Sequence, residues 1–373
     1  MSSGIEQKRI VIKIGSSSLT SRHGEISQRK LEKLSDEIVS LKDAGHEVVL
    51  VSSGAVAAGY RKLGCLDRPT LLPEKQAAAS IGQGLLMETY SKLFMSNGYV
   101  ASQILITRSD FLDENRYKNV RNTLNVLLER GIIPIVNEND TVTVDRLKFG
   151  DNDTLSAKVA SIVEADQLMI LSDIDGLYDR HPGQYKDAKL IQQVNQITPE
   201  IEAVAGDSES TVGTGGMRSK IEAVKIALAS GIPTFLGNAS KDQIVVNALT
   251  GKAKGTYFNP EKSQTYLNQK KKWIAFHSHP EGEIVIHQKA KNRLIEENAH
   301  LTLSGVYDVK GPFKKGSVIR IRDHSGREIG CGVVNISSKE LQTLTKKVTH
   351  PSFDLTIMEC KDFVCNQEVL ITV

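Results

Sequence analysis

The apolar positions of the first 258 residues follow two alternating spacings. Short β-branched runs predict strands over residues 10–14, 47–51, 100–106, 132–136, 166–171 and 234–236. Between them, apolar residues three and four apart predict helices over residues 31–41, 76–94, 117–130, 154–163 and 219–230. Such alternation predicts a three-layer αβα fold with a mainly parallel central sheet. Ligands bind beyond the carboxyl ends of strands in these sheets, so chemistry is expected there.

The pattern changes after Phe258. Residues 259–272 are polar and include Pro260 and a run of three lysines, which predicts a linker. From Trp273 onward, short strands punctuated by glycine predict a small β-barrel domain. The predicted organisation is therefore a first domain over 1–258, a linker over 259–272 and a second domain over 273–373.

The composition argues against several classes of protein. A net charge of +3 gives no overall attraction to nucleic acid or membranes. There is no run of 18 apolar residues, and the polar stretch Met1–Lys8 lacks the apolar core of a signal peptide. The four cysteines show no zinc-type CxxC spacing. We therefore expect a cytoplasmic protein with reduced thiols and no membrane partner.

Two early strands end in small polar residues. Lys13 is followed by Gly15 and three serines, and the second strand runs into Ser53 and Gly54. Backbone N–H groups at such turns can approach an anion closely, although either turn alone is equally typical of an ordinary surface loop. Because the chain has no GxxxxGK[ST], GxGxxG, HRD or DFG sequence, any phosphate would be bound by a different fold.

Carboxylate and amide residues gather in two further segments. Residues 137–140 read Asn-Glu-Asn-Asp after a predicted strand, and residues 150–153 read Gly-Asp-Asn-Asp before a predicted helix. The residues between them, 141–144 and 147–149, predict a hairpin. The plain alternative is a set of turns with a helix cap at Asp151 or Asp153.

Two further segments could bind a nucleotide. Ser172 and Asp173 follow an apolar strand and precede a glycine turn, where ribose or a base edge could bind. Residues 206–217 are rich in glycine, serine and threonine and lead into a helix with Lys220 in its first turn, which suits ATP phosphates. Ser219 and Glu222 predict a capping box at the start of that helix.

Taken together and in order, these segments resemble the glutamate 5-kinases, a family of the amino acid kinase superfamily. The resemblance is carried by VIKIGSSSLT, VSSGAVAAG, IVNENDTVTV, FGDNDTLSA, LSDIDGLYDRHP and AGDSESTVGTGGMRSK. The last part of the chain resembles a PUA domain. The resemblance implies ATP-dependent phosphorylation of the side-chain carboxylate of L-glutamate, with Mg²⁺, as the first step of proline biosynthesis. It also implies a homo-oligomer inhibited by proline.

The family's residue roles carry over to matching positions. Lys13 and Lys220 would neutralise phosphate oxygens, and Asp151 would hold the two lysines in place. Ser53, Asp140 and Asn152 would bind glutamate. The residues that would bind ATP are Lys13, Gly15, Ser172, Asp173, Thr214, Gly215, Gly216, Met217, Arg218, Ser219 and Lys220. The chain departs from the usual pattern in its three serines at 16–18 and in residues 179–181 before Pro182.

These residue types suit the implied chemistry. A glutamate side chain, with a pKa of about 4.3, is already anionic at neutral pH and needs no general base. The difficulty is its approach to an anionic phosphoryl group, which two lysines and Mg²⁺ would ease. Asp140 would pair with the α-ammonium, which favours free glutamate over its N-acetylated relative.

Two alternatives remain open. The chain could be another small-molecule kinase of this fold, acting on acetylglutamate, aspartate or a nucleoside monophosphate. It could instead be an RNA-binding regulator with an inactive kinase domain. From His277 to Val373 there are 13 Lys+Arg and 12 Asp+Glu. Non-specific RNA binding usually needs a basic face, so the charge balance favours a structural or regulatory role for the second domain.

Overall fold

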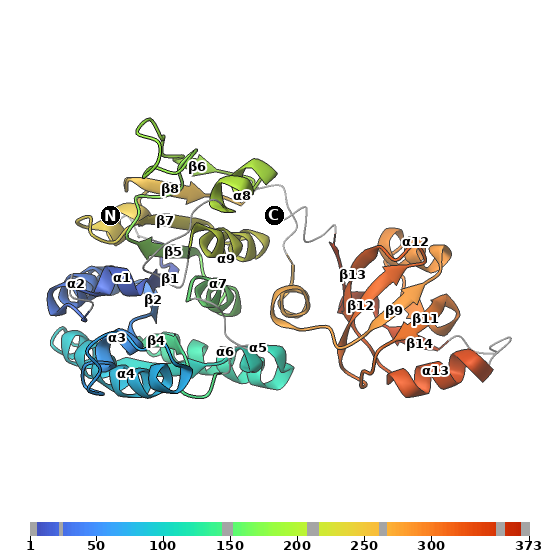
Figure 1. The fold of residues 1–373 in the computed structure, drawn as a ribbon. Coiled ribbons are helices and arrows are strands. Elements are labelled where there is room, and N and C mark those ends of the chain that lie inside the picture. The colour runs from blue at the N-terminus through green and yellow to red at the C-terminus, as the bar shows by residue number, and fades with distance from the viewer. Residues whose placement is uncertain are drawn as a thin grey trace. The chain divides into compact units, whose positions relative to one another are not determined.

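The computed structural model describes residues 6–21, 25–143, 152–206, 216–260, 267–347 and 355–366. The chain divides into two compact units (Figure 1). The first runs to residue 262, apart from Phe111–Glu114, and the second comprises Phe111–Glu114 and the chain from residue 263 on.

In the described part of the first unit, eight strands form one sheet in the order β3-β4-β2-β1-β5-β7-β8-β6. Neighbouring strands are parallel, except that β7 and β8 are antiparallel. The strands are β1 (Arg9–Ile14), β2 (Glu47–Ser52), β3 (Ala101–Ile106), β4 (Ile133–Glu138), β5 (Gln167–Ser172), β6 (Gln193–Val194), β7 (Thr234–Asn238) and β8 (Gly255–Phe258).

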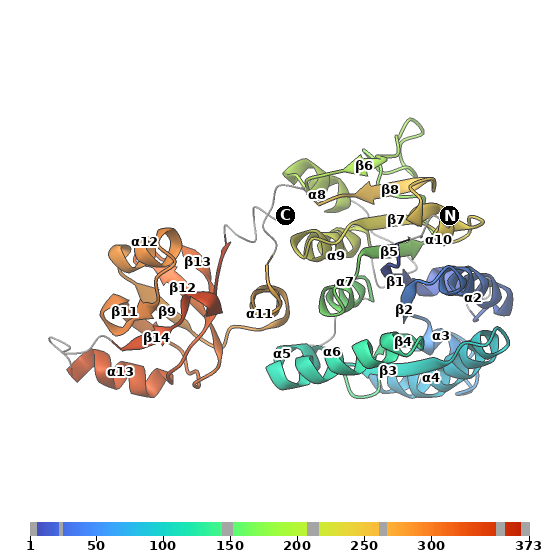
Figure 2. The same ribbon diagram turned by 180° about the vertical axis from the view of Figure 1, so that it is seen from behind.

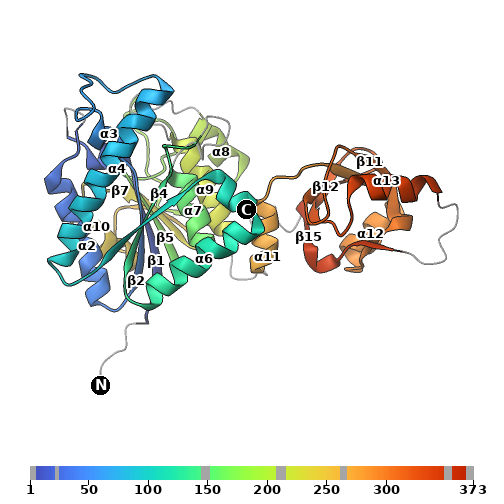
Figure 3. The same ribbon diagram turned by 90° about the horizontal axis from the view of Figure 1, so that it is seen from below.

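Helices cover both faces of this sheet. Seen from below in Figure 3, α2, α4 and α10 lie on one face, and α6, α7 and α9 lie on the other. The helices up to the end of the sheet are α1 (Ser16–Leu19), α2 (Gln28–Asp43), α3 (Ala55–Gly59), α4 (Leu72–Met95), α5 (Arg108–Leu112), α6 (Glu114–Glu129), α7 (Asn152–Ile162), α8 (Pro199–Gly206), α9 (Met217–Ala229) and α10 (Ile244–Leu249). The predicted class, a mainly parallel sheet with helices on both faces, is confirmed.

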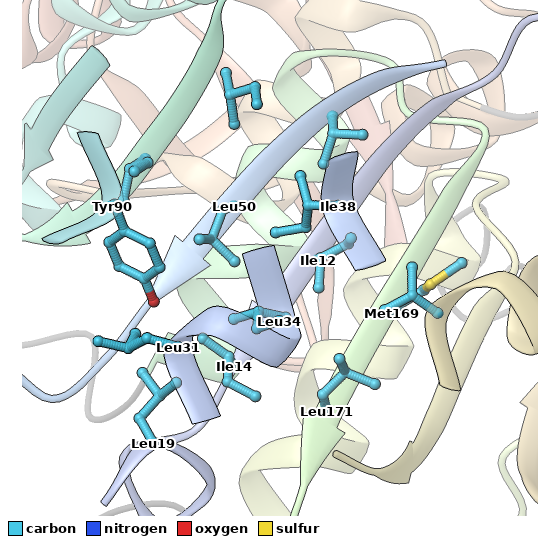
Figure 4. Packing of buried hydrophobic residues seen from close by; sticks show 14 of the residues in the cluster. Ile12, Ile14, Leu19, Leu31, Leu34, Ile38, Leu50, Tyr90, Met169 and Leu171 are labelled. Atoms are coloured by element: carbon cyan, nitrogen blue, oxygen red, sulfur yellow. The ribbon is translucent and has the colours of Figure 1, made fainter. Parts of the chain in front are cut away.

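The core on the α2 side follows from residue spacing. Alternate residues of β1, such as Ile12 and Ile14, point to this face and are fully buried, as expected for a strand period of two. They meet Leu34 and Ile38, which the helical period places on one side of α2 (Figure 4). Burial of each such side chain contributes roughly 1.5–3 kcal/mol, which anchors the central strands.

The carboxyl ends of the central strands meet at one edge of the sheet. Ile14 at the end of β1 pairs with Ser52 on one side and Leu171 on the other. Val51 of β2 in turn pairs with Val136 of β4. The residues that follow β1, β2, β4 and β5 are therefore neighbours in space, and they include the candidates Gly15, Ser53, Asp140 and Asp173.

The second unit is β-rich and is seen from behind in Figure 2. Its described strands form one sheet in the order β11-β9-β12-β13-β15 and a separate pair, β10-β14. The strands are β9 (Glu283–Ile286), β10 (Leu301–Thr302), β11 (Val306–Lys310), β12 (Val318–Asp323), β13 (Glu328–Val333), β14 (Thr356–Met358) and β15 (Phe363–Cys365). Its helices are α11 (Gln269–Lys272), α12 (Gln288–Glu296) and α13 (Ser338–Lys347), with short turns η2 (Trp273–His277), η3 (Leu303–Gly305) and η4 (Cys360–Asp362).

Three local predictions differ from the structure. Residues 269–277, expected to end a linker and begin a strand, are helical, and Asn268 caps α11 by accepting a hydrogen bond from the N–H of Lys271 over 2.9 Å. Ser219 does not cap α9, because the helix begins two residues earlier at Met217. Thr141 and Val142, expected in a hairpin, lie in a turn, and Thr143 after them belongs to no strand. The other residues of that hairpin fall outside the described residues.

No helix in the described ranges combines the length and the apolar character needed to cross a membrane.

Candidate active site

Two lysines share one carboxylate at the strand ends. Lys13 of β1 forms an ion pair with Oδ1 of Asp153, and Lys220 of α9 donates to Oδ2 of Asp153 over 3.1 Å. Asp153 is completely buried, and each lysine is 5% exposed. Ser219 also donates to Oδ2 over 3.1 Å. The cluster carries a net charge of +1, which suits an anionic ligand.

The surroundings of Asp153 keep it ionised. Burial by itself would raise the pKa of this carboxyl, but the charges and hydrogen bonds of Lys13 and Lys220 outweigh it and hold the pKa below the ordinary value. A buried carboxylate between two cations reduces their mutual repulsion, so both ammonium groups can remain close together.

The structure thus places Asp153 where the sequence analysis expected Asp151, which lies outside the described residues. The segment Gly-Asp-Asn-Asp offers two aspartates, and the spacing of residues alone does not distinguish them. The direction in which each side chain leaves the helix could have distinguished them. Asn152 and Asp153 begin α7, and the approximately 100° between successive helical residues points them to different neighbours. Asn152 faces the end of β2, and Asp153 faces β1 and α9.

A cavity of 290 Å³ lies beside this cluster. Its lining includes Ser172, Asp173, Gly216, Met217 and Lys220, which are five of the predicted ATP residues from two distant segments. Apolar and aromatic residues, among them Leu177, Tyr178 and Pro182, contribute further walls. A partly apolar cavity that ends near ammonium groups suits a nucleotide, whose base is flat and whose phosphates are anionic.

The loop after β5, which forms one wall, is held by buried and half-buried hydrogen bonds. The N–H of Leu177 donates to Oγ1 of Thr256 over 2.8 Å, and that hydroxyl donates to the carbonyl of Ile191 over 2.7 Å. Asp175 accepts from Asn238 over 3.0 Å and pairs with Lys254 over 2.8 Å. These bonds fix the shape of the wall before any ligand enters.

The other predicted ATP residues lie in several places. Gly15 follows β1 and lies beside the ammonium group, since a Cβ there would be in ordinary contact with Nζ of Lys13 at 3.6 Å. Ser219 contacts Asp153, whereas Arg218 is exposed and does not line the cavity. Thr214 and Gly215 lie outside the described residues.

A second polar group lies at the ends of β2 and β4. Nδ2 of Asn152 donates to the carbonyl of Ser52 over 2.9 Å, to Oγ of Ser53 over 2.8 Å and to Oδ1 of Asn137 over 2.9 Å. Gly54 has a φ of 102°, a left-handed conformation that glycine adopts without strain, and this lets the chain turn directly after Ser53. We call Ser53, Asn137 and Asn152 the acceptor site.

Sequence reasoning missed Asn137 as a member of this site, although it named the segment that contains it. Its carboxamide is 3% exposed and lies at the end of a strand, where a polar side chain needs a specific partner. Asp140 is the third residue that was predicted to bind glutamate. It is half-buried in the turn after β4, and its N–H donates to the carbonyl of Glu138 over 3.0 Å.

Known proteins that are similar to this chain identify its family. The model of the amino acid kinase family matches residues 8–238, which is more than half of the chain. Two relatives named glutamate 5-kinase 2 are each 61% identical to it. The relative from Bacillus licheniformis aligns over 98% of both chains, and that from Bacillus subtilis over 100% of both.

The chain belongs to the glutamate 5-kinases of the amino acid kinase family. Glutamate 5-kinase 1 of Bacillus subtilis, 45% identical over 90% of this chain and 92% of its own, is a more distant member. The PUA domain model matches residues 282–350, within the second unit, as the sequence analysis expected. The protein is therefore a kinase with an attached PUA domain.

A solved structure supports the fold independently. Carbamate kinase from Giardia lamblia bound to AMP-PNP superposes with a TM-score of 0.50 at 19% identity, covering 69% of this chain and 99% of the other. At this identity the likeness concerns the amino acid kinase fold alone.

Proposed function

We propose that this kinase transfers the γ-phosphoryl group of ATP to the side-chain carboxylate of free L-glutamate and forms L-glutamyl 5-phosphate. The observation that carries the proposal is the buried Lys13–Asp153–Lys220 cluster, of which Lys13 belongs to β1 and Lys220 lines the cavity beside Ser172. Relatives that are up to 61% identical over the full chain are named glutamate 5-kinase, and this supports glutamate as the substrate.

The lysines supply what this reaction needs from the protein. Phosphoryl transfer depends on in-line positioning and on neutralising charge that spreads over the phosphoryl oxygens. Lys13 and Lys220 approach from different elements, β1 and α9, and Asp153 keeps both in place without removing their net positive charge. A lysine acts as a compact point charge, which suits a phosphoryl group that changes shape during transfer. No general base is required, because the attacking carboxylate is already ionised.

Mg²⁺ would arrive with ATP. In the ranges that the structure describes, no group of three or more His, Cys, Asp or Glu side chains lies together. Mg²⁺ commonly binds substrate phosphates, several waters and one or two carboxylates. Asp173, which lines the cavity and accepts a hydrogen bond from Ser172 over 3.0 Å, is a carboxylate suited to such a shared ion. The ion would neutralise phosphate oxygens alongside the two lysines.

Glutamate would lie over the acceptor site, with its side chain directed toward Lys13 and Lys220. Ser53 and Asn152 would contact it directly, and Asp140 would provide the charge that pairs with the α-ammonium. The nucleotide would bind by Lys13, Gly15, Ser172, Asp173 and residues 214–220. An acyl phosphate is labile, so a following enzyme must consume it, and we assign the step to the start of proline biosynthesis, in the cytoplasm, with proline as an inhibitor of a homo-oligomeric enzyme.

A trapping assay tests the proposal. The purified protein with Mg²⁺, ATP and hydroxylamine is incubated with L-glutamate or with N-acetyl-L-glutamate at equal concentrations. We expect the hydroxamate of glutamate to accumulate with ADP, and the acetylated substrate to give a much smaller signal. A larger signal from N-acetyl-L-glutamate would contradict the assignment of free glutamate, and the same assay with aspartate would reveal the remaining amino acid alternative.

A further inference from the structure

Helix α4 carries three polar side chains at intervals of seven residues, and the middle one bonds to the acceptor site. Gln76, Gln83 and Tyr90 lie on one side of the helix, because seven residues make almost two full turns. Gln76 donates to the carbonyl of Thr143 over 3.2 Å, and the hydroxyl of Tyr90 lies 2.9 Å from that of Ser52. In Figure 4 the oxygen of Tyr90 points toward the end of β2.

Gln83, the middle residue of this row, bonds to Asn137 of the acceptor site. Oε1 of Gln83 accepts a hydrogen bond from Nδ2 of Asn137 over 2.9 Å. Asn137 is almost fully buried, and its Oδ1 in turn accepts from Nδ2 of Asn152 over 2.9 Å. Gln83 therefore begins a chain of carboxamides that runs through Asn137 to Asn152 at the acceptor site.

Two backbone groups support the same direction of this chain. The N–H of Glu138 donates to Oδ1 of Asn137 over 2.9 Å, so the oxygen of that carboxamide faces Glu138 and Asn152 and its nitrogen faces Gln83. The carbonyl of Ser52 accepts from Asn152 over 2.9 Å, so the nitrogen of Asn152 also points into the protein. A backbone N–H can only donate and a carbonyl can only accept, so both groups favour the carboxamide orientations that the bond from Asn137 to Oε1 of Gln83 also favours.

The orientation of Asn152 determines which of its atoms is left to bind the substrate. The two hydrogens of Nδ2 of Asn152 are shared among three acceptors, on Ser52, Ser53 and Asn137, so none remains for a ligand. Oδ1 of Asn152 has no hydrogen-bond partner among the described residues, and it is an acceptor. The hydroxyl of Ser53 accepts from Asn152 and keeps its own hydrogen to donate.

We propose that Gln83 is a positioning residue that makes Asn152 present its oxygen, rather than its nitrogen, to the substrate. The inference rests on the proposed function and deepens it. Glutamate with both carboxylates ionised has a single hydrogen-bond donor, the α-ammonium. Oδ1 of Asn152 therefore meets the ammonium group, and the hydroxyl of Ser53 meets a carboxylate.

Variants of Gln83 that keep or remove the acceptor oxygen test this role. Gln83→Met has a similar length but no acceptor, which leaves the buried Nδ2 of Asn137 without its partner and removes one of the bonds that orient the two carboxamides. Gln83→Glu keeps an acceptor oxygen. Because an unpaired buried amide is costly, orientations that give Nδ2 of Asn137 a new partner compete with the binding orientation, and we expect the KM for glutamate to rise about tenfold in Gln83→Met. The KM for ATP should stay unchanged, and Gln83→Glu should resemble the wild type.

A matched control separates this effect from damage to α4. Ser80 is exposed on the same helix, and its one side-chain hydrogen bond to a described residue is to the helix carbonyl of Ala77, over 2.8 Å. Ser80→Ala should leave both KM values unchanged. Gln83→Leu, a second variant without an acceptor, should repeat the result of Gln83→Met, and melting temperatures should show that each variant is folded.

Glutarate, which is glutamate without the ammonium group, tests which group meets Asn152. Its inhibition constant against glutamate should be the same in the wild type and in Gln83→Met, because no donor of glutarate reaches Asn152. An unchanged KM for glutamate in Gln83→Met, or an equal rise in the inhibition constant of glutarate, would overturn the role of Gln83. A wild type that does not phosphorylate glutamate would instead contradict the proposed function.

Discussion

Lys220 donates to Oδ2 of Asp153 over 3.1 Å, although the two residues lie 67 positions apart in the chain. The other oxygen of Asp153 pairs with Lys13, so a fully buried carboxylate lies between two almost fully buried ammonium groups. Three charged groups in a region with little water are stable only as a set, because removal of one leaves the others without compensation. This set gives the clearest prediction about catalysis.

Asp153→Asn should impair both catalysis and folding. Loss of one partner of a buried ion pair costs roughly 3–5 kcal/mol, so the melting temperature should fall. The two lysines should separate, and since a single preorganised electrostatic contact contributes about 2.7–4 kcal/mol to a transition state, kcat should fall at least about a hundredfold. Initial rates and thermal unfolding measure the two effects.

Asp151→Asn is the matched comparison for that variant. It changes the other aspartate of the same motif, to which the resemblance of the sequence assigned the role of holding the lysines. If Asp153 holds them, Asp151→Asn should retain the wild-type melting temperature. A normal melting temperature in Asp153→Asn with a large loss in Asp151→Asn would reverse the assignment.

Lys158, on the helix that also carries Asn152 and Asp153, should make stability depend on alkaline pH. Burial, assisted by the charge of Arg108, lowers its pKa from 10.5 to about 8. Between these values the unfolded chain binds a proton that the folded chain does not, so the free energy of unfolding rises with pH in this window. Below about pH 8 the charged lysine costs stability, of order 3 kcal/mol for a shift of this size.

Lys158→Met, which keeps a long apolar side chain, tests this dependence. Chemical unfolding of the variant at pH 7 should need more denaturant than unfolding of the wild type. The advantage should shrink steadily and disappear near the ordinary lysine pKa. A variant that is less stable than the wild type by the same amount at pH 7 and pH 10 would contradict the lowered pKa of Lys158.

Asp140→Asn should weaken glutamate binding. If Asp140 pairs with the α-ammonium, the change removes one charge from a partly desolvated pair while keeping an acceptor oxygen. We expect a loss of about 2 kcal/mol, or some thirtyfold in kcat/KM for glutamate, with the KM for ATP unchanged. Asparagine caps a turn about as well as aspartate does, so superimposable glutamate saturation curves would show that Asp140 is only a turn residue.

Gly82→Ala should displace the turn that carries Ser53. A Cβ at Gly82 would lie 1.8 Å from the carbonyl oxygen of Ala55, so α3 and α4 would have to separate. Because α3 follows Ser53 and Gly54 directly, we expect a lower melting temperature and a higher KM for glutamate. Gly84→Ala, two residues along the same helix with open space around it, should instead gain up to about 1 kcal/mol of helix propensity.

The parts of this fold that could be predicted from the sequence are those that local patterns determine. Alternating apolar runs placed the central strands, and the helical spacing of Leu34 and Ile38 placed α2 on one face of the sheet. The glycine and serine turns after β1 and β2 were found because such residues follow strand ends for identifiable steric reasons.

What the sequence could not resolve depends on contacts between distant segments. The choice between Asp151 and Asp153 depends on which side of α7 faces β1 and α9. Gln83 reads as an ordinary polar residue of a surface helix, and its partner Asn137 lies 54 residues away. The hydroxyl of Ser219 fitted a cap locally, but Asp153 competes for it in the folded chain.

The central claim, that the side-chain carboxylate of glutamate attacks the γ-phosphorus of ATP, can be tested by oxygen transfer. Glutamate labelled with ¹⁸O in its side-chain carboxylate is incubated with the enzyme, Mg²⁺ and ATP, and hydroxylamine cleaves the product at its acyl carbon. The account predicts that each phosphate released carries one ¹⁸O atom and each hydroxamate keeps one. Phosphate without ¹⁸O, released at the rate of ADP formation, would show that water is the acceptor and would contradict the account.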